Sequence, residues 1–502
     1  MAINTVHPPE AGDNYSVRAA LASPKLLRIE ALAGLVVALA LIPEAISFSI
    51  IAGVDPEVGL FASFTMAVSI AFLGGRPAMI SAATGAIALV LAPLVREYGI
   101  DYLIATVMLG GVLQIVLAAT GFAKLMRFIP RSVMVGFVNA LAILIFTAQI
   151  PHMIDAPFVV YPMIAVGIII MVVLPRMTQA VPAPLVAIVL LTAFTVIAAI
   201  NVPDVGDEGD LPNNLPALFT PDVPLNFETL RIIAPYALAM ALVGLLESLM
   251  TAKLVDDITD SHSDKTREAW GQGAANIITG FFGGMGGCAM IGQTMINVKA
   301  SGARTRISTF LAGVFLLALV VGAGDIVGII PMGALVAVMT MVAVGTFDWH
   351  SIQLNTLRRM PKSENIVMLS TVAVVVATHN LAIGVGVGVI IAMVMFARRV
   401  AHFTEVIDVA HPDENTRIYK VVGELFFASS NDLFYQFDYA GDPQNIVIDM
   451  SESHIWDAST VAALDAIETK YRSKGKNVDI QGLNEASMDR HSRLAGHLGG
   501  TD

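Results

Sequence analysis

The 502-residue sequence has few charged residues and a single cysteine. Asp, Glu, Lys and Arg make up 14% of the chain, whereas soluble domains carry about 25%. Most of the chain is therefore not expected to lie in water. Because Cys288 is alone, an intrachain disulfide is excluded. The net charge of −12 excludes a broadly basic, nucleic-acid-binding protein.

Motifs of enzymes and of cleaved leader segments are also missing. No glycine-rich loop is followed by Lys-Ser or Lys-Thr, so nothing indicates nucleotide hydrolysis. The histidines and acids show no metal-ligand spacing, and no catalytic residue, cofactor or metal is expected. Residues 1–24 are polar and lack the apolar core of a signal peptide. The first membrane span is therefore expected to direct insertion.

Long hydrophobic runs fill most of the remaining sequence. From about residue 27 to 403 they recur almost without pause, and about fourteen are long enough to suggest membrane spans, although several are short or interrupted. Lys and Arg concentrate in alternate loops, and Asp and Glu in the others. This positive-inside pattern predicts an even number of spans with both termini cytoplasmic, in the inner (plasma) membrane of the cell.

The composition divides the chain into three parts: a cytoplasmic segment at 1–24, a transmembrane transport domain at 25–403 and a small cytoplasmic domain at 404–502. In the last part, IYKVVGELFF, NIVIDMS and NVDIQGL have the pattern of strands, and TVAALDAIETKYRSKG has that of an amphipathic helix. Strands alternating with helices predict a small α/β layer structure.

The membrane region repeats itself at about 25–202 and 227–403. Its third span in each half is short, interrupted and rich in small residues, at 74–93 and 283–302. The opening spans each carry one carboxylate, Glu44 and Glu247. Seven spans per half would make the second half enter from the opposite side. The sequence therefore predicts two inverted repeats.

Paired, interrupted spans at corresponding positions are the best sequence pointer to the binding site of a transporter. Half-helices are expected to begin near Ala83–Gly85 and near Ala289–Gly292. Helix N-termini carry partial positive charge and unpaired N–H groups, which hold anions. The predicted substrate is therefore a small anion.

Several motifs resemble the SulP anion transporters, the sulfate permeases and their bicarbonate and dicarboxylate relatives. They include IPEAISFSIIAGVDPEVGL, RFIPRSVMVGFVNA and GGMGGCAMIGQTMINVKASGARTRIS. The tail, with IDMSESHIWDASTVAALDAI, resembles the STAS domain of that family. The resemblance implies about fourteen transmembrane segments in core and gate domains, usually a homodimer, with the substrate site between the third and tenth segments.

Glu44 follows Pro43 in the middle of a span. Intramembrane acids are functional by default, and the resemblance places Glu44 in a bacterial subgroup thought to couple transport to protons. We expect Pro43 to break the span so that Glu44 faces a cavity as a proton carrier. In the alternative, Glu44 is a structural acid that accepts hydrogen bonds at the helix break.

Glu247 and Thr251 are four residues apart and share one face of a helix. Sodium-coupled bicarbonate members of the family place Asp where Glu247 stands, with Thr at the position of Thr251. This pair could therefore bind a proton or Na⁺, or it could belong to a hydrogen-bond network between spans.

The predicted anion site takes residues from three spans. Animal members of the family carry Arg at about the position of Gln293. Because this chain lacks that Arg, the resemblance does not simply imply that it exchanges chloride or bicarbonate as they do. Small residues are equally explained by close helix packing. The candidates are Ser47, Phe48, Ala83, Thr84, Met290, Ile291 and Gln293.

Ser459 occupies the position that is phosphorylated in related soluble STAS domains. A phosphate is well accommodated at a helix N-terminus, yet a serine there also serves as an N-cap. The cap is the interpretation that we favour.

The sequence thus predicts a secondary active transporter that moves sulfate, bicarbonate or a dicarboxylate such as fumarate with a proton, by alternating access. The alternatives are a sodium-dependent bicarbonate transporter and an anion channel or sensor read out by the STAS domain. The expected partners are the anion, the lipid bilayer, a second subunit and an unknown cytoplasmic partner of the STAS domain, with no nucleic acid.

Overall fold

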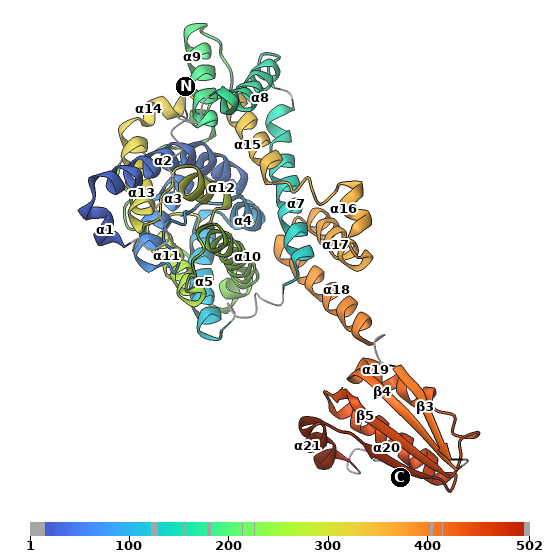
Figure 1. The fold of residues 1–502 in the computed structure, drawn as a ribbon. Coiled ribbons are helices and arrows are strands. Elements are labelled where there is room, and N and C mark those ends of the chain that lie inside the picture. Colours follow the sequence, from blue (N-terminus) through green and yellow to red (C-terminus); the bar gives the residue numbers. More distant parts are fainter. Residues whose placement is uncertain are drawn as a thin grey trace. The chain divides into compact units, whose positions relative to one another are not determined.

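The computed structural model describes residues 16–121, 129–154, 156–177, 182–212, 214–224, 226–401, 405–413 and 415–495. The chain divides into two compact units between Val389 and Ile390. The first unit is helical, and the second contains a four-stranded sheet (Figure 1). The division falls within helix α18 (Leu381–Ala401), and each unit is described by itself.

The elements of the membrane region follow one another in two series. The first series comprises α1 (Val17–Ala22), α2 (Pro24–Ala52), α3 (Pro56–Leu73), β1 (Ser81–Ala82), α4 (Gly85–Tyr98), α5 (Ile100–Ala119), α7 (Arg131–Thr147), α8 (Val160–Met177) and α9 (Ala183–Ile197). The second comprises α10 (Phe227–Thr259), α11 (Lys265–Phe281), β2 (Cys288–Ala289), α12 (Ile291–Met295) with the π-helical turn η4 (Ile296–Ala300), α13 (Arg306–Gly322), α14 (Gly324–Gly328), α15 (Met332–Thr346), α16 (Leu354–Arg359), α17 (Lys362–Thr378) and α18.

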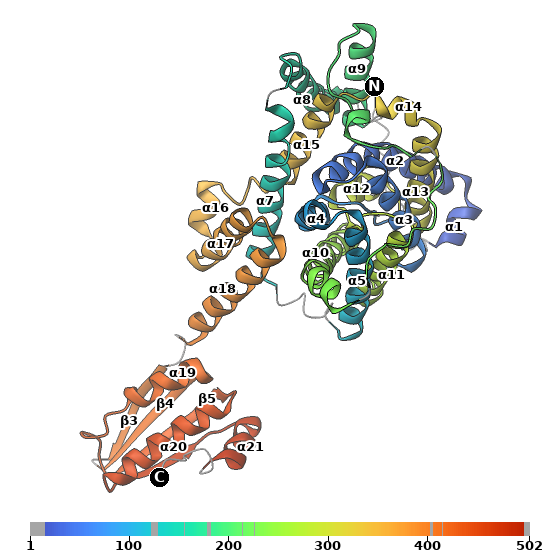
Figure 2. The ribbon, with the colours of Figure 1, turned by 180° about the vertical axis from the view of Figure 1, so that it is seen from behind.

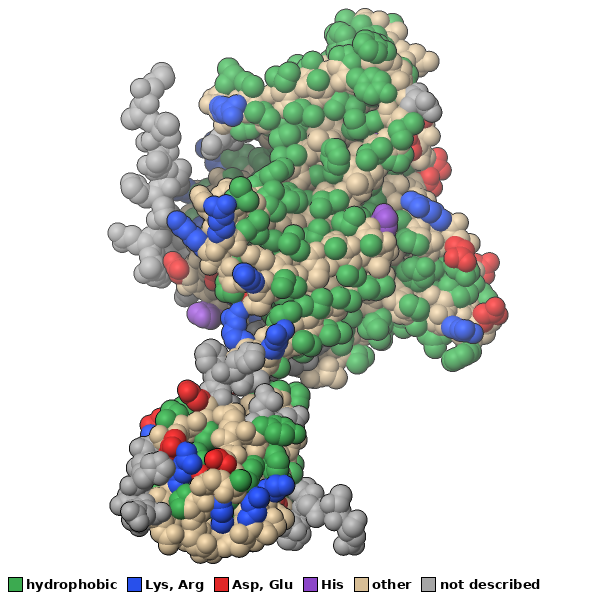
Figure 3. All heavy atoms as spheres, turned by 90° about the vertical axis from the view of Figure 1, so that its right-hand side faces the viewer, with side chains coloured by type: hydrophobic (Ala, Val, Ile, Leu, Met, Phe, Trp, Pro, Cys, Tyr) green, Lys and Arg blue, Asp and Glu red, His purple; other side chains and the backbone are tan. Residues whose placement is uncertain are grey.

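Among the described residues, seven helices are long and apolar enough to cross a membrane. Three shorter helices, α9, α13 and α15, are also apolar. On the face shown in Figure 3, hydrophobic side chains cover most of the first unit, and charged side chains gather at its margins. This distribution is that of a protein embedded in a bilayer, which confirms the predicted helical membrane fold.

The two series correspond element by element. Without the short α1, α14 and α16, the described residues of each series form seven helices, with η4 taken as the continuation of α12. The third helix of each series, α4 or α12, follows a two-residue strand. The fifth helix begins in each case directly after a proline, Pro130 for α7 and Pro331 for α15. Proline fits there because it pre-sets the backbone and needs no donor at a helix start.

Helices of both series mix in two groups. The core group contains α2–α5 and α10–α13, with α5 packed on α11 and α13 packed on α2 and α3. The gate group contains α7–α9, α15 and α17, with α7 packed on α17 and α8 on α15 (Figures 1 and 2). The groups meet where α2 contacts α9 and α15 and where α4 contacts α7.

Helix α2 runs without interruption from Pro24 to Ala52, with Pro43 inside it. The prediction that Pro43 breaks this span is therefore wrong. A proline removes one backbone donor, and neighbouring helices and Ser or Thr side chains make this tolerable inside a membrane helix. The hydroxyl of Ser47 adds a bond of 2.8 Å to the carbonyl of Pro43, whereas the carbonyl that the proline leaves without its helical donor is that of Leu39. Glu44 thus projects from an intact helix.

The second unit has the sheet order β3-β4-β5-β6, with β3 (Glu405–Asp413) antiparallel to β4 (Thr416–Leu425). The pairs of β4 with β5 (Asn445–Ile455) and of β5 with β6 (Asn477–Gln481) are parallel. Helices α19 (Phe427–Leu433), α20 (Ala458–Ser473) and α21 (Glu485–Leu494) complete the unit.

The core of the second unit contains Val421 of β4, Ile448 of β5 and Leu464 of α20. The three predicted strands and the predicted helix are confirmed. Strand β3 was not predicted, because Pro412 and two register shifts interrupt its pattern. Proline is compatible with β3 because this strand lies at the edge of the sheet.

Candidate functional site

The centre of the core group is a short antiparallel strand pair. Ser81 of β1 lies opposite Ala289 of β2, and Ala82 lies opposite Cys288. Each strand leads within three residues into a helix, α4 or α12. Because the strands are antiparallel, the two helices run away from the pair in opposite directions, and their N-termini face each other across it. The unpaired N–H groups of both first turns therefore point toward one region.

Two glycines make this approach possible. A Cβ at Gly287 would lie 2.0 Å from the carbonyl oxygen of Ala82, so no side chain fits between the strands. A Cβ at Gly85 would lie 2.9 Å from the ring of Phe48. The small residues of the two interrupted spans therefore serve close backbone approach, and the half-helices begin where the sequence predicted, at Gly85 and Ile291.

Three of the predicted anion-site residues meet at the start of α4. Thr84 is the N-cap, and its hydroxyl accepts a hydrogen bond from the N–H of Ile87 at 3.4 Å. Phe48 of α2 covers Gly85, and the N–H of Ala83 donates to the hydroxyl of Ser63 at 3.2 Å. Phe48, Ala83 and Thr84 are all buried.

Ser47, another of the predicted anion-site residues, lies in α2. Its hydroxyl is buried and donates to the carbonyl of Pro43 within α2. The donor of Ser47 is therefore used inside its own helix, and the side chain stabilises the turn that contains the proline.

The other predicted residues lie at the start of α12. Met290 is the N-cap and is buried, whereas Ile291 is partly exposed. The amide Nε2 of Gln293 donates to Oε1 of Glu44 at 2.9 Å, which joins α12 to α2. The Oε1 atom of Gln293 is buried and has no hydrogen-bond partner among the described residues.

Glu44 and Gln293 border a cavity of about 320 Å³ between the core and gate groups. They supply the only polar side chains of its wall within the described chain. The wall is completed by Ala40, Met171, Pro175, Pro182, Ala183, Pro184, Ile296, Val338, Met341 and Val342. A mostly apolar wall with a few convergent polar groups is typical of small-molecule sites.

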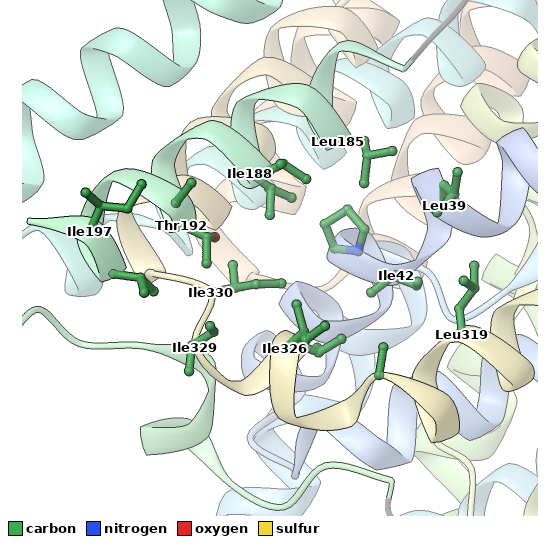
Figure 4. A pocket seen from close by; sticks show the side chains of 16 residues that line it. Leu39, Ile42, Leu185, Ile188, Thr192, Ile197, Leu319, Ile326, Ile329 and Ile330 are labelled. Atoms are coloured by element: carbon green, nitrogen blue, oxygen red, sulfur yellow. The ribbon is translucent and has the colours of Figure 1, made fainter. Parts of the chain in front are cut away.

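A second cavity of about 510 Å³ lies between α2, α9, α13 and α14. Its lining side chains are apolar except for Thr192, as the labelled side chains in Figure 4 illustrate. The hydroxyl of Thr192 has no partner among the described residues. An ion in this cavity would lose its hydration without compensating groups. Of the two cavities, the one that contains Glu44 is therefore the candidate anion site.

Glu247 lies in α10 and is 7% exposed. Its Oε2 atom accepts a hydrogen bond of 3.0 Å from the thiol of Cys288 in β2. The sulfur of Cys288 in turn lies 3.2 Å from the hydroxyl oxygen of Thr84. These contacts form a continuous series from Glu247 to the N-cap of α4. Sequence reasoning missed Cys288, although its place next to the predicted start of a half-helix was a usable signal.

Thr251 does not contact the carboxylate of Glu247. Its hydroxyl is fully buried and donates to the backbone carbonyl of Glu247 at 2.8 Å. The neighbouring Ser248 accepts from the N–H of Ala289 at 3.1 Å and fixes β2 against α10. No cluster of three or more His, Cys, Asp or Glu side chains suited to a metal ion occurs in the described part of the chain.

Ser459 lies exposed in the first turn of α20. The N-cap is Asp457, whose Oδ1 accepts from the N–H of Thr460 at 3.1 Å. The expectation that Ser459 caps the helix is therefore wrong. Asp and Ser cap about equally well, and here the aspartate occupies the position with extended backbone before the helix.

Comparison with known proteins identifies both parts of the chain. Residues 27–165 and 152–371 match the Sulfate permease family, and residues 407–496 match the STAS domain. The chain is 52% identical over 470 residues to the "Putative sulfate transporter YbaR" of Bacillus subtilis (strain 168). The match covers 93% of this chain and 97% of YbaR. It is 25% identical over 527 residues to the bicarbonate transporter BicA of Picosynechococcus, over 93% of this chain and 91% of BicA.

Solved structures share the fold. The inward-facing anion transporter Solute Carrier 26 family member A9 from mouse superposes with a TM-score of 0.80 at 15% identity, over 93% of this chain and 87% of that chain. The transmembrane domain of a cyanobacterial BicA superposes with a TM-score of 0.64 at 23% identity, over 72% of this chain and 98% of that chain.

Proposed function

Because the chain belongs to the sulfate permease family and is an anion transporter rather than an enzyme, we propose that it carries its anion by secondary active transport, together with a proton. The proposed substrates are sulfate, bicarbonate and dicarboxylates such as fumarate. YbaR is named as a sulfate transporter and BicA as a bicarbonate transporter; the dicarboxylate is our own addition.

The hydrogen bond between Glu44 and Gln293 carries the proposal. It places a carboxylate in the wall of the cavity, one hydrogen bond away from the first turn of α12. An anion near the same helix start would be repelled strongly by an ionised Glu44, because charges are poorly screened in a low-dielectric site. Protonation of Glu44 removes this repulsion. A proton and an anion would therefore occupy the site together.

The position of the cavity supports alternating access. Its wall combines side chains of the core group, such as Glu44 and Gln293, with side chains of the gate group, such as Met171 and Met341. A rigid-body movement of one group against the other would expose the cavity to one side of the membrane at a time.

Sodium coupling at Glu247 is the second candidate. The buried carboxylate of Glu247 favours Na⁺ binding because a hydroxyl, that of Thr84, lies nearby on the other side of Cys288. The hydroxyl of Thr251 bonds to backbone and would have to turn to reach a cation at the carboxylate. For this reason we place the coupling proton at Glu44 and keep Na⁺ at Glu247 as the alternative.

The remaining parts of the proposal concern the surroundings of the transporter. We place it in the inner (plasma) membrane with cytoplasmic termini, as a homodimer, and assign its STAS domain to a cytoplasmic partner. Phosphorylation of Ser459, which is exposed, would be one way to control that partner.

The test is uptake of labelled sulfate, bicarbonate and fumarate by the full chain in proteoliposomes, first under a proton gradient and then under a Na⁺ gradient. We expect one anion to accumulate against its gradient when protons flow inward, and Glu44→Gln to abolish that accumulation. Glu97→Gln, which removes an exposed carboxylate of α4, is the matched control and should leave it intact. Accumulation driven by Na⁺ alone, or purely passive flux with a large single-channel current, would overturn the proposal.

A further inference from the structure

We infer that Cys288 is a positioning residue that transmits the charge state of Glu247 to the Thr84 hydroxyl at the start of α4. This inference rests on the proposed function, since it describes how the anion site is regulated. It concerns three side chains from three elements, α10, β2 and the N-cap of α4.

The three side chains are enclosed by protein. Glu247 is 7% exposed, Thr84 is 2% exposed and Cys288 is fully buried. The thiol–carboxylate contact is 3.0 Å, and the contact between thiol and hydroxyl is 3.2 Å. Bulk water therefore does not compete with the contacts between these three side chains.

The direction of the hydrogen bonds follows from donor counting. A thiol has one hydrogen, and here it is donated to Oε2 of Glu247. The sulfur can then only accept from Thr84, whose own oxygen accepts from the N–H of Ile87. Every donor in the series thus points toward an ionised Glu247, and the hydroxyl hydrogen of Thr84 is used up.

Neutralising Glu247 reverses the series. A proton added at Oε2 forms a carboxyl O–H that donates to the sulfur of Cys288. The thiol hydrogen then turns to the oxygen of Thr84, which accepts it. The hydroxyl hydrogen of Thr84 is released and becomes available at the start of α4, whose first turn faces that of α12 across the strand pair. One O–H bond forms at Glu247, and no other covalent bond changes.

The expected consequence is positive coupling between the proton at Glu247 and the anion held near the two facing helix starts. Such coupling is reciprocal and typically changes affinity by about 5- to 150-fold. It differs from the role proposed for Glu44, which acts by direct repulsion from the cavity wall.

The other titratable groups near Glu247 are engaged elsewhere. Within the described residues, Glu247 forms no ion pair, and its carboxylate has Cys288 as its one titratable hydrogen-bond partner. Glu44 of α2 bonds to Gln293 of α12, and Glu268 of α11 accepts from the N–H groups of Gly75 and Arg76. The remaining titratable side chains of the packed helices α4, α5, α10 and α11 are Arg96, Glu97, Tyr98, Asp101, Tyr102, Glu228, Arg231, Tyr236, Lys253, Asp256, Asp257, Lys265 and Arg267.

The experiment separates the two acids by using the Glu44→Gln variant of the full chain as the background. We measure the KM for anion exchange in Na⁺-free proteoliposomes that have the same pH on both sides, at values between about pH 5 and pH 8. The labelled anion is the one that the wild type accumulates. We expect KM to fall by at least about fivefold toward acid pH. Adding Cys288→Ala or Thr84→Val should reduce this change to less than about twofold.

Cys288→Ser provides the rescue, because a serine hydroxyl also donates and accepts one hydrogen bond in series. It should keep the pH dependence that Cys288→Ala loses. Thr279→Val is the matched control: it removes another buried hydroxyl, bonded to Thr65 at 2.8 Å, and should leave the pH dependence unchanged. Thermal melting of each variant verifies that it is folded.

Two results would overturn the inference: a KM independent of pH while Cys288 is intact, or an unchanged pH dependence in Cys288→Ala. Failure of the proposed function looks different, since the wild type itself would then show no proton-driven accumulation of any of the three anions.

Discussion

Gln293 and Glu44 form a hydrogen bond of 2.9 Å that joins the short helix α12 to the long helix α2. The two residues are far apart in the sequence, and each comes from a different half of the repeat. Their contact lies in the wall of the cavity between the core and gate groups. In the proposed mechanism, the proton on Glu44 and the anion near α12 are therefore separated by a single hydrogen bond.

The first prediction concerns this contact. Gln293→Leu removes the donor that stabilises the charged carboxylate, a bond to a charged group worth about 1.5–3 kcal/mol. Glu44 should then hold its proton more readily, and half-maximal uptake should move to higher pH by about one to two units. Initial uptake rates of the labelled anion at a series of pH values measure the shift. A profile that does not move would show that the bond is not part of the coupling.

A second prediction concerns the strand pair. Gly287→Ala would place a Cβ 2.0 Å from the carbonyl oxygen of Ala82, and we expect loss of transport together with a lower melting temperature. Gly345→Ala in α15, where no atom lies within 4 Å of the added Cβ, is the control and should melt normally. A fully active Gly287→Ala protein would contradict the geometry of the pair.

The cap of α20 gives a third prediction. Asp457 accepts from the N–H groups of Thr460 and Phe427, so Asp457→Ala should destabilise the STAS unit by about 1 kcal/mol. Ser459→Ala should change it by less than about 0.5 kcal/mol, as is usual for an exposed site. Amide hydrogen exchange of α20 in the full chain compares the two. An equal loss in both variants would return a capping role to Ser459.

The fourth prediction is a pH dependence in the second unit. The N–H of Ser451 donates to Asp449 at 2.9 Å, and this hydrogen bond lowers the pKa of Asp449 below its usual 3.8. Because the pKa of Asp449 is lower in the folded than in the unfolded state, the ionised group stabilises the fold at pH values above the unfolded-state pKa. This stabilisation is lost as the pH falls through the folded-state pKa. Asp449→Ala should therefore speed amide exchange near Ser451 several-fold at neutral pH, with little difference from wild type in strong acid. A difference that persists in strong acid would point to another cause.

The sequence allowed prediction of features that depend on local chemistry. The small residues of the two interrupted spans located the half-helices near Ala83–Gly85 and Ala289–Gly292. Features that depend on contacts between distant parts of the chain could not be predicted from the sequence. The thiol of Cys288 meets Glu247 only because β2 packs on α10, and no spacing in the sequence encodes that contact.

Local signals were also ambiguous where two residues could serve one purpose. Pro43 indicated a break in α2, yet the helix continues through it. Asp457 and Ser459 were both suitable caps, and the backbone conformation of Asp457 decided between them. In each case the outcome depends on packing that a linear pattern does not contain.

The strand pair β1–β2 has a further consequence for the diversity of such proteins. The two helix starts are fixed by main-chain contacts and by glycines that leave no room for side chains. The partial positive charge of the two helix N-termini therefore depends on the backbone and not on particular side chains. The side chains beside it, such as Gln293, are free to vary without disturbing that scaffold. If the anion binds as proposed, related chains could differ in the anion they accept by exchanging a few side chains beside the two helix starts, while the starts themselves stay in place.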